Sequence, residues 1–135
     1  MMRQLLIEYI TAAVIFLAAD FVWLRNMGPA FYTPELGGLL RDEPQLGIAL
    51  AFYLLFVAGL VMFVIHPGMQ GEPLSLVAVK GAIFGLVAYA TYDLTNLATV
   101  KGFTNKVALV DMAWGTFVSA AVSFLTVWLL RRLLA

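Results

Sequence analysis

Four long apolar stretches separated by short polar ones dominate the pattern of this chain. They cover residues 5–24, 46–65, 76–98 and 107–130. Each is about 20 residues long, the length at which an α-helix crosses a hydrocarbon core of about 30 Å. Backbone polar groups in such a core must be paired inside their own segment, so helices are the expected form. The pattern predicts an all-α membrane protein, a four-transmembrane-helix bundle that forms one domain over residues 1–135.

The connections between these stretches differ in length and chemistry. Residues 25–45 form the longest loop, and its middle, AFYTPELGGLL, is expected to lie as a short interfacial segment at the membrane surface. The second connection, HPGMQGEP, consists of turn-forming residues. The third, KGFTNK, is so short that the last two helices should form an antiparallel hairpin. Four spans place both termini on the same side of the membrane.

The distribution of Lys and Arg does not decide the orientation. The terminal side has Arg3, Lys80, Arg131 and Arg132, and the other side has Arg25, Arg41, Lys101 and Lys106. The two sides carry equal numbers of Lys and Arg, so the positive-inside rule favours neither orientation. Because the Arg131-Arg132 pair abuts a helix end, we expect cytoplasmic termini in a bacterial inner membrane. The tie is also what insertion in both orientations would produce.

Composition supports a membrane protein and excludes several functions. The chain is 63% hydrophobic and 12% charged, whereas a soluble domain carries about 25% charge. A net charge of zero without any basic run argues against a nucleic-acid partner. There is no cysteine, no phosphate loop and no cofactor fingerprint, so we expect no cofactor and no enzyme. Glu8 interrupts the first apolar run, so we expect that segment to be retained and not cleaved as a signal peptide.

Three aspartates lie toward the membrane face that carries the first and third loops. Asp20 is near the end of the first span, Asp93 near the end of the third and Asp111 near the start of the fourth. They open similar tetrapeptides, DFVW, DLTN and DMAW, whose last residues lie one turn further along a helix. Those last residues are Trp23, Asn96 and Trp114, and an indole N–H or an amide can donate to a carboxylate.

Small residues predict where the last two helices touch. Gly81 and Gly85 form a GxxxG pattern, which lets another helix approach closely. The same face continues through Tyr89, Tyr92, Asp93 and Asn96. On the fourth helix a small and polar stripe consists of Asp111, Gly115, Ser119 and Ser123. We expect the two stripes to face each other.

These patterns predict a buried polar cluster with Asp93, Asn96 and Asp111 at its centre. Asp20, Tyr92, Trp23 and Trp114 are expected around it. Its oxygens suit a hard cation of unknown identity, a proton or a cationic head group. The alternative is a network that only locks the helices, with the aspartates paired to Lys101, Lys106 or a tyrosine and Asp20 paired to Arg25. A metal-dependent membrane enzyme that uses the three aspartates is a further alternative.

Glu8 and His66 are expected to be structural. Glu8 lies toward the opposite membrane face, where Lys80 or Arg131 of a neighbouring helix is the expected partner. His66 precedes Pro67-Gly68, and we interpret it as a helix-end residue favoured by the helix dipole.

The segments DFVWL, YATYDLTNLAT and VDMAWGT together resemble a family of short bacterial membrane proteins known as domain of unknown function 2177. The resemblance covers essentially the whole chain and implies a multi-span inner-membrane protein, but it implies no activity and no catalytic residue. By analogy alone, four spans, an acid in the first helix and the charge tie also look like the small multidrug-resistance exporters, which act as antiparallel dimers.

Two classes of function follow for this polytopic membrane protein. In the first, the cluster binds or transports a cation, a proton or a small polar ligand, and the protein is a transporter or a channel-like homodimer, with the dual-topology exporter as a variant. In the second, the cluster only fixes helix packing, and the protein is an accessory or scaffold subunit of a larger membrane complex.

Overall fold

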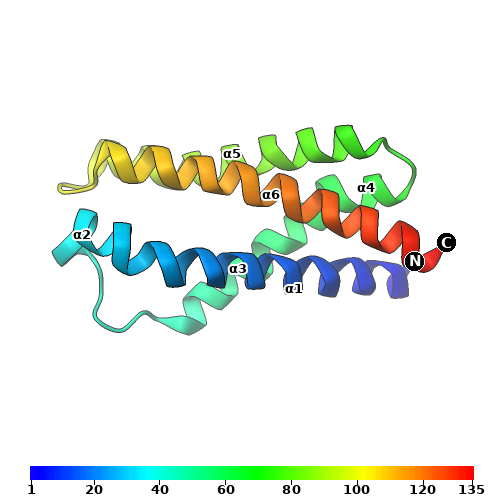
Figure 1. Cartoon of the computed structure of the whole chain (residues 1–135), viewed down its shortest axis with the longest axis horizontal. Coiled ribbons are helices and arrows are strands. Elements are labelled where there is room, and N and C mark those ends of the chain that lie inside the picture. The colour runs from blue at the N-terminus through cyan, green and yellow to red at the C-terminus, as the bar shows by residue number, and fades with distance from the viewer.

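The computed structural model describes all residues from 1 to 135, and every regular element in it is a helix. Four helical spans are long and apolar enough to cross a membrane: Met2–Leu39, Leu46–Met69, Leu74–Thr99 and Asn105–Leu134. Both termini lie at one end of the bundle, here called the terminal end, and the opposite end is called the loop end (Figure 1). The predicted four-helix membrane fold is confirmed, and every span is somewhat longer than its predicted range.

The first span continues through most of the predicted first loop. Helix α1 (Met2–Met27) passes directly into the π-helical turn η1 (Gly28–Tyr32), the short helix α2 (Thr33–Leu36) and the 3-10 turn η2 (Gly37–Leu39). Pro29 and Pro34 lie inside this continuous helical span, and each lacks the backbone N–H that a regular α-helix uses, which fits the change from α-helical to π-helical hydrogen bonding at η1. The loop predicted over residues 25–45 therefore shrinks to residues 40–45, and its interfacial segment is a helical extension of α1.

The second span is also helical beyond its predicted end. It consists of α3 (Leu46–Leu60), the π-helical turn η3 (Val61–Ile65) and α4 (His66–Met69). The turn expected from His66 onward therefore begins only after Met69. At its other end, α3 begins well short of the end of the bundle at which α2 lies (Figure 1). Near the loop end the bundle is consequently built mainly from the first, third and fourth spans.

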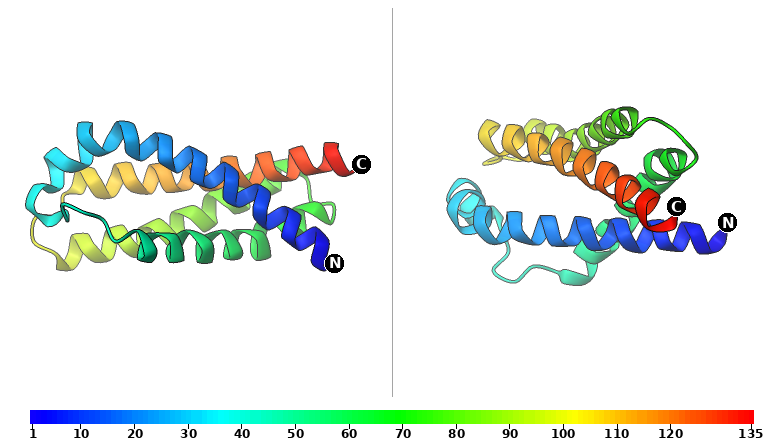
Figure 2. Two further views of the ribbon diagram at one scale, coloured as in Figure 1. Left: turned by 90° about the horizontal axis from the view of Figure 1, so that it is seen from below. Right: turned by 45° about the vertical axis from the view of Figure 1, so that its right-hand side comes forward.

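Helices α5 (Leu74–Thr99) and α6 (Asn105–Leu134) form the predicted antiparallel hairpin, which Figure 2 shows in two further views. A Cβ atom added at Gly81 would lie 2.8 Å from the carbonyl oxygen of Ser119, and one added at Gly85 would overlap that of Gly115. The two predicted stripes therefore face each other so closely that only glycine fits at the contact points.

The hydrophobic core lies where the four spans meet. It is made by Phe16 of α1, by Leu60 and Ile65 of the second span, by Val77 of α5 and by Val122 of α6, among others. Many large apolar side chains point outward instead, which is expected for a bundle surrounded by lipid. The charged groups lie toward the two ends of the bundle, whereas the buried polar side chains between them are hydroxyls of α6, such as Ser119 and Ser123.

Candidate functional site

Asp20 joins three of the four spans at the loop end. It is buried on α1, and its Oδ1 accepts a hydrogen bond from Trp114 Nε1 of α6 at 3.0 Å. Its Oδ2 accepts a hydrogen bond from the Tyr53 hydroxyl of α3. The alternative pairing of Asp20 with Arg25 is wrong, because the two residues form no ion pair and the carboxylate is held by these neutral donors.

Asp111 of α6 is tied to the first span by a chain of two hydrogen bonds. The Tyr32 hydroxyl donates to Asp111 Oδ1 at 2.8 Å, and Trp23 Nε1 donates to the Tyr32 oxygen at 3.1 Å. Tyr32 is the last residue of η1, and a π-helical turn contains an extra residue that re-aims the side chains after it. The indole rings of Trp23 and Trp114 stack face to face, 4.2 Å apart and 5° from parallel.

The expected donor role of the two tryptophans is met in part. Trp114 does donate to a carboxylate, but to Asp20 of another helix and not to Asp111 of its own. Trp23 donates to the hydroxyl of Tyr32 and to no carboxylate. The tetrapeptide pattern thus identified donors of the cluster but assigned them to the wrong acceptors.

Asp93 of α5 has no hydrogen-bond partner. Its side chain is 0% exposed, and neither carboxylate oxygen receives a hydrogen bond. The alternative in which a lysine neutralises it is wrong, because Lys106 pairs with Glu35 at 3.7 Å and Lys101 forms no ion pair. Burial of an ionised carboxylate without a partner is costly, and insertion scales put an acid at the centre of a span at roughly 2.5–3.5 kcal/mol.

Two adjoining cavities lie beside these aspartates. The inner cavity, of about 300 Å³, is lined by Asp20, Trp23, Leu24, Phe52, Tyr53, Ala88, Tyr89, Tyr92, Asp111 and Trp114. The outer cavity, of about 420 Å³, is lined by Asp93 and Asp111 together with residues of η1, α2 and the 40–45 segment. Leu24, Tyr92 and Asp111 line both cavities. Asp93 therefore opens onto the outer cavity, and Asp111 stands at the boundary between the two.

The structure brings most of the predicted site residues together. The cavity-lining residues among them are Asp20, Trp23, Tyr92, Asp93, Asp111 and Trp114. Asn96 is half-buried one turn from Tyr92 and lines neither cavity. No three His, Cys, Asp or Glu residues come close enough together to hold one metal ion, so the three aspartates do not converge on a single point.

Two tyrosines of the site, Tyr32 and Tyr53, were missed by the sequence pattern, although both line the cavities. Tyr89 also lines the inner cavity; the pattern identified it on the face that leads to Asp93 but did not include it in the predicted cluster. A signal for Tyr53 was present, since it is the one side chain of α3 that can form a hydrogen bond through a hydroxyl, amide or charged group. For Tyr32 there was no such signal, because its contact with Asp111 depends on the helical extension through η1.

Glu8 occupies the opposite end of the bundle and is fully partnered. It is 0% exposed on α1, accepts a hydrogen bond from Gln4 Nε2 at 2.9 Å and lies 3.0 Å from His66 Nδ1. The prediction that Lys80 or Arg131 pairs with Glu8 is wrong, and so is the interpretation of His66 as a mere helix-end residue. His66 follows the π-helical turn η3 directly, which places its ring beside α1.

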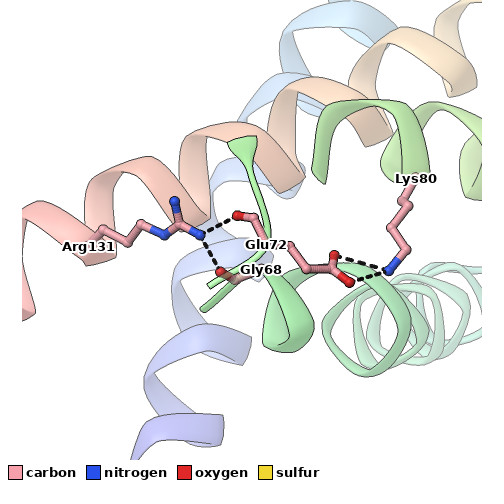
Figure 3. A network of polar contacts seen from close by, with 4 residues as sticks. All are labelled: Gly68, Glu72, Lys80 and Arg131. Carbon is pink, nitrogen blue, oxygen red and sulfur yellow. Dashed lines mark hydrogen bonds and ion pairs between the residues drawn. The ribbon is translucent and has the colours of Figure 1, made fainter. Parts of the chain in front are cut away.

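The two cations expected beside Glu8 stabilise the turn between α4 and α5 instead. Lys80 Nζ pairs with the Glu72 carboxylate at 2.8 Å, and Arg131 donates to the carbonyl oxygens of Gly68 and Glu72 (Figure 3). Arg131 of α6 thereby holds the turn that precedes α5. Each charged group in this network has a partner in another part of the chain, which fits a structural role.

Comparison with known proteins assigns the chain to a family but not to an activity. Residues 5–128 match the family model described as "Predicted membrane protein (DUF2177)". Neither the curated proteins nor the solved structures include a match to this chain. The match covers most of the chain, and the four candidate membrane spans of the structure agree with the description of a membrane protein. The chain therefore belongs to the DUF2177 family of predicted membrane proteins.

Proposed function

We propose that the protein binds a proton or a small polar cation at Asp93 and Asp111 and transports it across the membrane. The observation that carries this proposal is Asp93, which is completely buried in a membrane span and has no partner for either oxygen. Such a group is stable only when it carries a proton or when a cation lies beside it. Acids within membrane spans commonly mark ion pathways and proton relays for this reason.

The arrangement of the cavities supports a path to these carboxylates. The outer cavity is lined at the loop end by Arg41, Asp42 and Pro44 of the segment between the first two spans. It reaches Asp93 and Asp111, and the inner cavity continues from Asp111 toward Asp20. A proton or cation that enters at the loop end would meet the unpaired Asp93 before it meets the hydrogen-bonded Asp20.

Infrared difference spectroscopy of the carboxyl C=O stretch tests the proposal directly. The purified protein in lipid is titrated with base from low to high pH, and separately with Na⁺ or K⁺ at constant pH. We expect a protonated carboxyl band that shifts or disappears on titration and that is absent from Asp93→Asn. Glu35→Gln is the matched control, because Glu35 lies outside the cavities. If Asp93→Asn and wild type give the same spectra, the proposed role of Asp93 is wrong.

We further propose that the protein lies in a bacterial inner membrane with its termini in the cytoplasm, so that the outer cavity opens on the other side. The Arg131-Arg132 pair at the end of α6 supports this orientation. A reporter fused after Ala135 should show a single, cytoplasmic location. Both orientations in one population would instead support the dual-topology exporter, although Glu8, the acid that such a mechanism would use, is engaged by His66 and Gln4.

The alternative function as an accessory subunit has one observation in its favour. Helix α3 exposes apolar side chains along its length, including Leu46 at its start and Leu55 in its second half, each 74% exposed. Partner helices and lipid can cover such a surface equally well. Native mass spectrometry of the protein released from its own membrane distinguishes transport from a role as an accessory subunit. A monomer or homodimer supports transport, and a heteromeric assembly of fixed stoichiometry supports the role as an accessory subunit.

A further inference from the structure

The walls of the inner cavity indicate which class of cation the site accepts. We infer that the ligand is a small organic monocation, an ammonium group held among aromatic rings and beside Asp20 and Asp111. This inference rests on the proposed function and narrows it, because a site for a proton or an inorganic cation needs no aromatic walls.

The lining of the inner cavity is mostly aromatic. Of its 10 lining residues 8 are hydrophobic, and six carry aromatic rings: Trp23, Phe52, Tyr53, Tyr89, Tyr92 and Trp114. Aromatic rings attract cations through their negative faces, most strongly where water is excluded, and cages of such rings bind quaternary ammonium groups. Ca²⁺ and Mg²⁺ are held by clusters of carboxylate and carbonyl oxygens, and no three His, Cys, Asp or Glu residues lie close enough together here to hold one metal ion.

The charge of the cavity points the same way. Asp20 and Asp111 are its charged lining residues, and no Lys or Arg lines it. Both oxygens of Asp20 are held by neutral donors, Tyr53 and Trp114, so the carboxylate is hydrogen-bonded but not neutralised. Asp111 receives its hydrogen bond from Tyr32, which is also neutral. Two acidic groups without a counter-cation in an apolar cavity favour a positively charged occupant.

The size of the cavity restricts the occupant to a small molecule. Its volume of about 300 Å³ is at the lower limit of the range of roughly 300–1,000 Å³ for ligand pockets. A trimethylammonium or a primary alkylammonium group fits such a space with its charge near a carboxylate and its alkyl surface against the rings.

A pair of water-soluble molecules of the same shape tests whether charge and rings act together. Choline and 3,3-dimethylbutan-1-ol differ only in having a quaternary nitrogen or a carbon at the branched centre. The protein carries 3 tryptophans, and Trp128→Phe leaves only Trp23 and Trp114, which line the cavity. Their fluorescence in the purified Trp128→Phe protein then reports on the site, with NaCl of equal ionic strength as the reference.

We expect choline to change the fluorescence saturably, and the neutral alcohol to need at least tenfold higher concentrations. Asp111→Asn should weaken choline binding at least tenfold. Tyr89→Leu should weaken it several-fold and Tyr89→Phe should not, since Tyr89 forms no hydrogen bond through its hydroxyl and the ring is retained. The comparison of the two ligands uses one folded protein, so it holds even where a variant is unstable.

Equal binding of choline and the neutral alcohol would overturn the inference, because the cavity would then select for apolar surface alone. No binding of choline, or choline binding that Na⁺ displaces at similar concentrations, would overturn it too. In either case a titratable carboxyl band that depends on Asp93 would leave the proposed function standing. If choline does not bind and no titratable carboxyl band depends on Asp93, both the inference and the proposed function are wrong.

Discussion

The two ends of the bundle treat their buried acids differently. At the terminal end, Glu8 is completely buried but has His66 and Gln4 as partners. At the loop end, Asp93 is as completely buried and has none. A partnered acid in a membrane stabilises one arrangement of helices, whereas an unpartnered one costs free energy that only a ligand or a proton can offset. We therefore interpret the polar contacts at the terminal end as structural and those at the loop end as a ligand-binding site.

Both ends use the same local device to build their polar contacts. At each end one residue that meets an acid of another helix lies in or directly after a π-helical turn: Tyr32, the last residue of η1, donates to Asp111, and His66, which follows η3, meets Glu8. The extra residue of a π-helical turn re-aims the side chains after it, and such turns are frequent at functional sites. What distinguishes the loop end is thus its additional, unpaired carboxylate and not its backbone geometry.

The largest loss of stability is expected from Glu8→Ala at the terminal end. Because His66 and Gln4 would lose a buried partner, the free energy of unfolding in mixed micelles should fall by about 3 kcal/mol. In the double variant with His66→Ala the two losses should not add, since both remove the same contact. Choline binding and the carboxyl band of Asp93 should be unchanged in the folded fraction. Fully additive losses would show that Glu8 and His66 are not coupled.

A smaller loss is expected from Arg131→Leu, which removes the hydrogen bonds to the carbonyl oxygens of Gly68 and Glu72. Hydrogen bonds to charged groups contribute about 1.5–3 kcal/mol, and Arg131 is only half-buried, so we expect a loss of about 1.5 kcal/mol. Hydrogen exchange of residues 69–74 should also accelerate. Arg132→Leu is the control, because Arg132 is exposed over Trp128. Equal losses in both variants would mean that Arg131 does not hold the turn.

A loss of about 1 kcal/mol is expected from Tyr32→Phe at the loop end, the contribution of a typical hydrogen bond. The variant removes the donor to Asp111 and the acceptor of Trp23 while it keeps the ring. Tyr89→Phe is the control, since that hydroxyl forms no hydrogen bond, and its unfolding free energy should stay near that of wild type. If the two variants were equally stable, the chain from Trp23 to Asp111 would contribute nothing.

The fold and the position of the site were predictable because both depend on patterns within single helices. Span length follows from apolar runs, the α5–α6 contact follows from Gly81 and Gly85, and the gathering of Asp20, Asp93 and Asp111 follows from their depth in alternating spans. Each of these features needs only the position of a residue along its own helix.

The partners of the acids were not predictable, because they depend on how each helix is rotated against the others. Trp114 donates to Asp20 and not to Asp111, although the sequence spacing favoured its own helix. Glu8 meets His66 because η3 shifts the helical register before that residue. No local pattern showed that α1 would continue through η1 and bring Tyr32 to Asp111.

The smallest change in stability is expected from Asp93→Asn. The matched variant Asp20→Asn shows how large the change is for a buried aspartate that does have hydrogen-bond partners. Both substitutions replace a buried aspartate at the loop end by an amide of the same shape. Asp20→Asn puts an amide N–H₂ group against one of two donors, Trp114 or Tyr53, and should cost about 2 kcal/mol. Asp93→Asn removes no hydrogen bond, so the unfolding free energy without ligand should change by less than about 0.5 kcal/mol or increase. The carboxyl infrared band that responds to protons or cations should nevertheless be lost in Asp93→Asn. A loss of stability for Asp93→Asn as large as that for Asp20→Asn would mean that Asp93 has a partner within the protein. The two ends of the bundle would then treat their buried acids alike, and Asp93 would no longer indicate a ligand-binding site at the loop end.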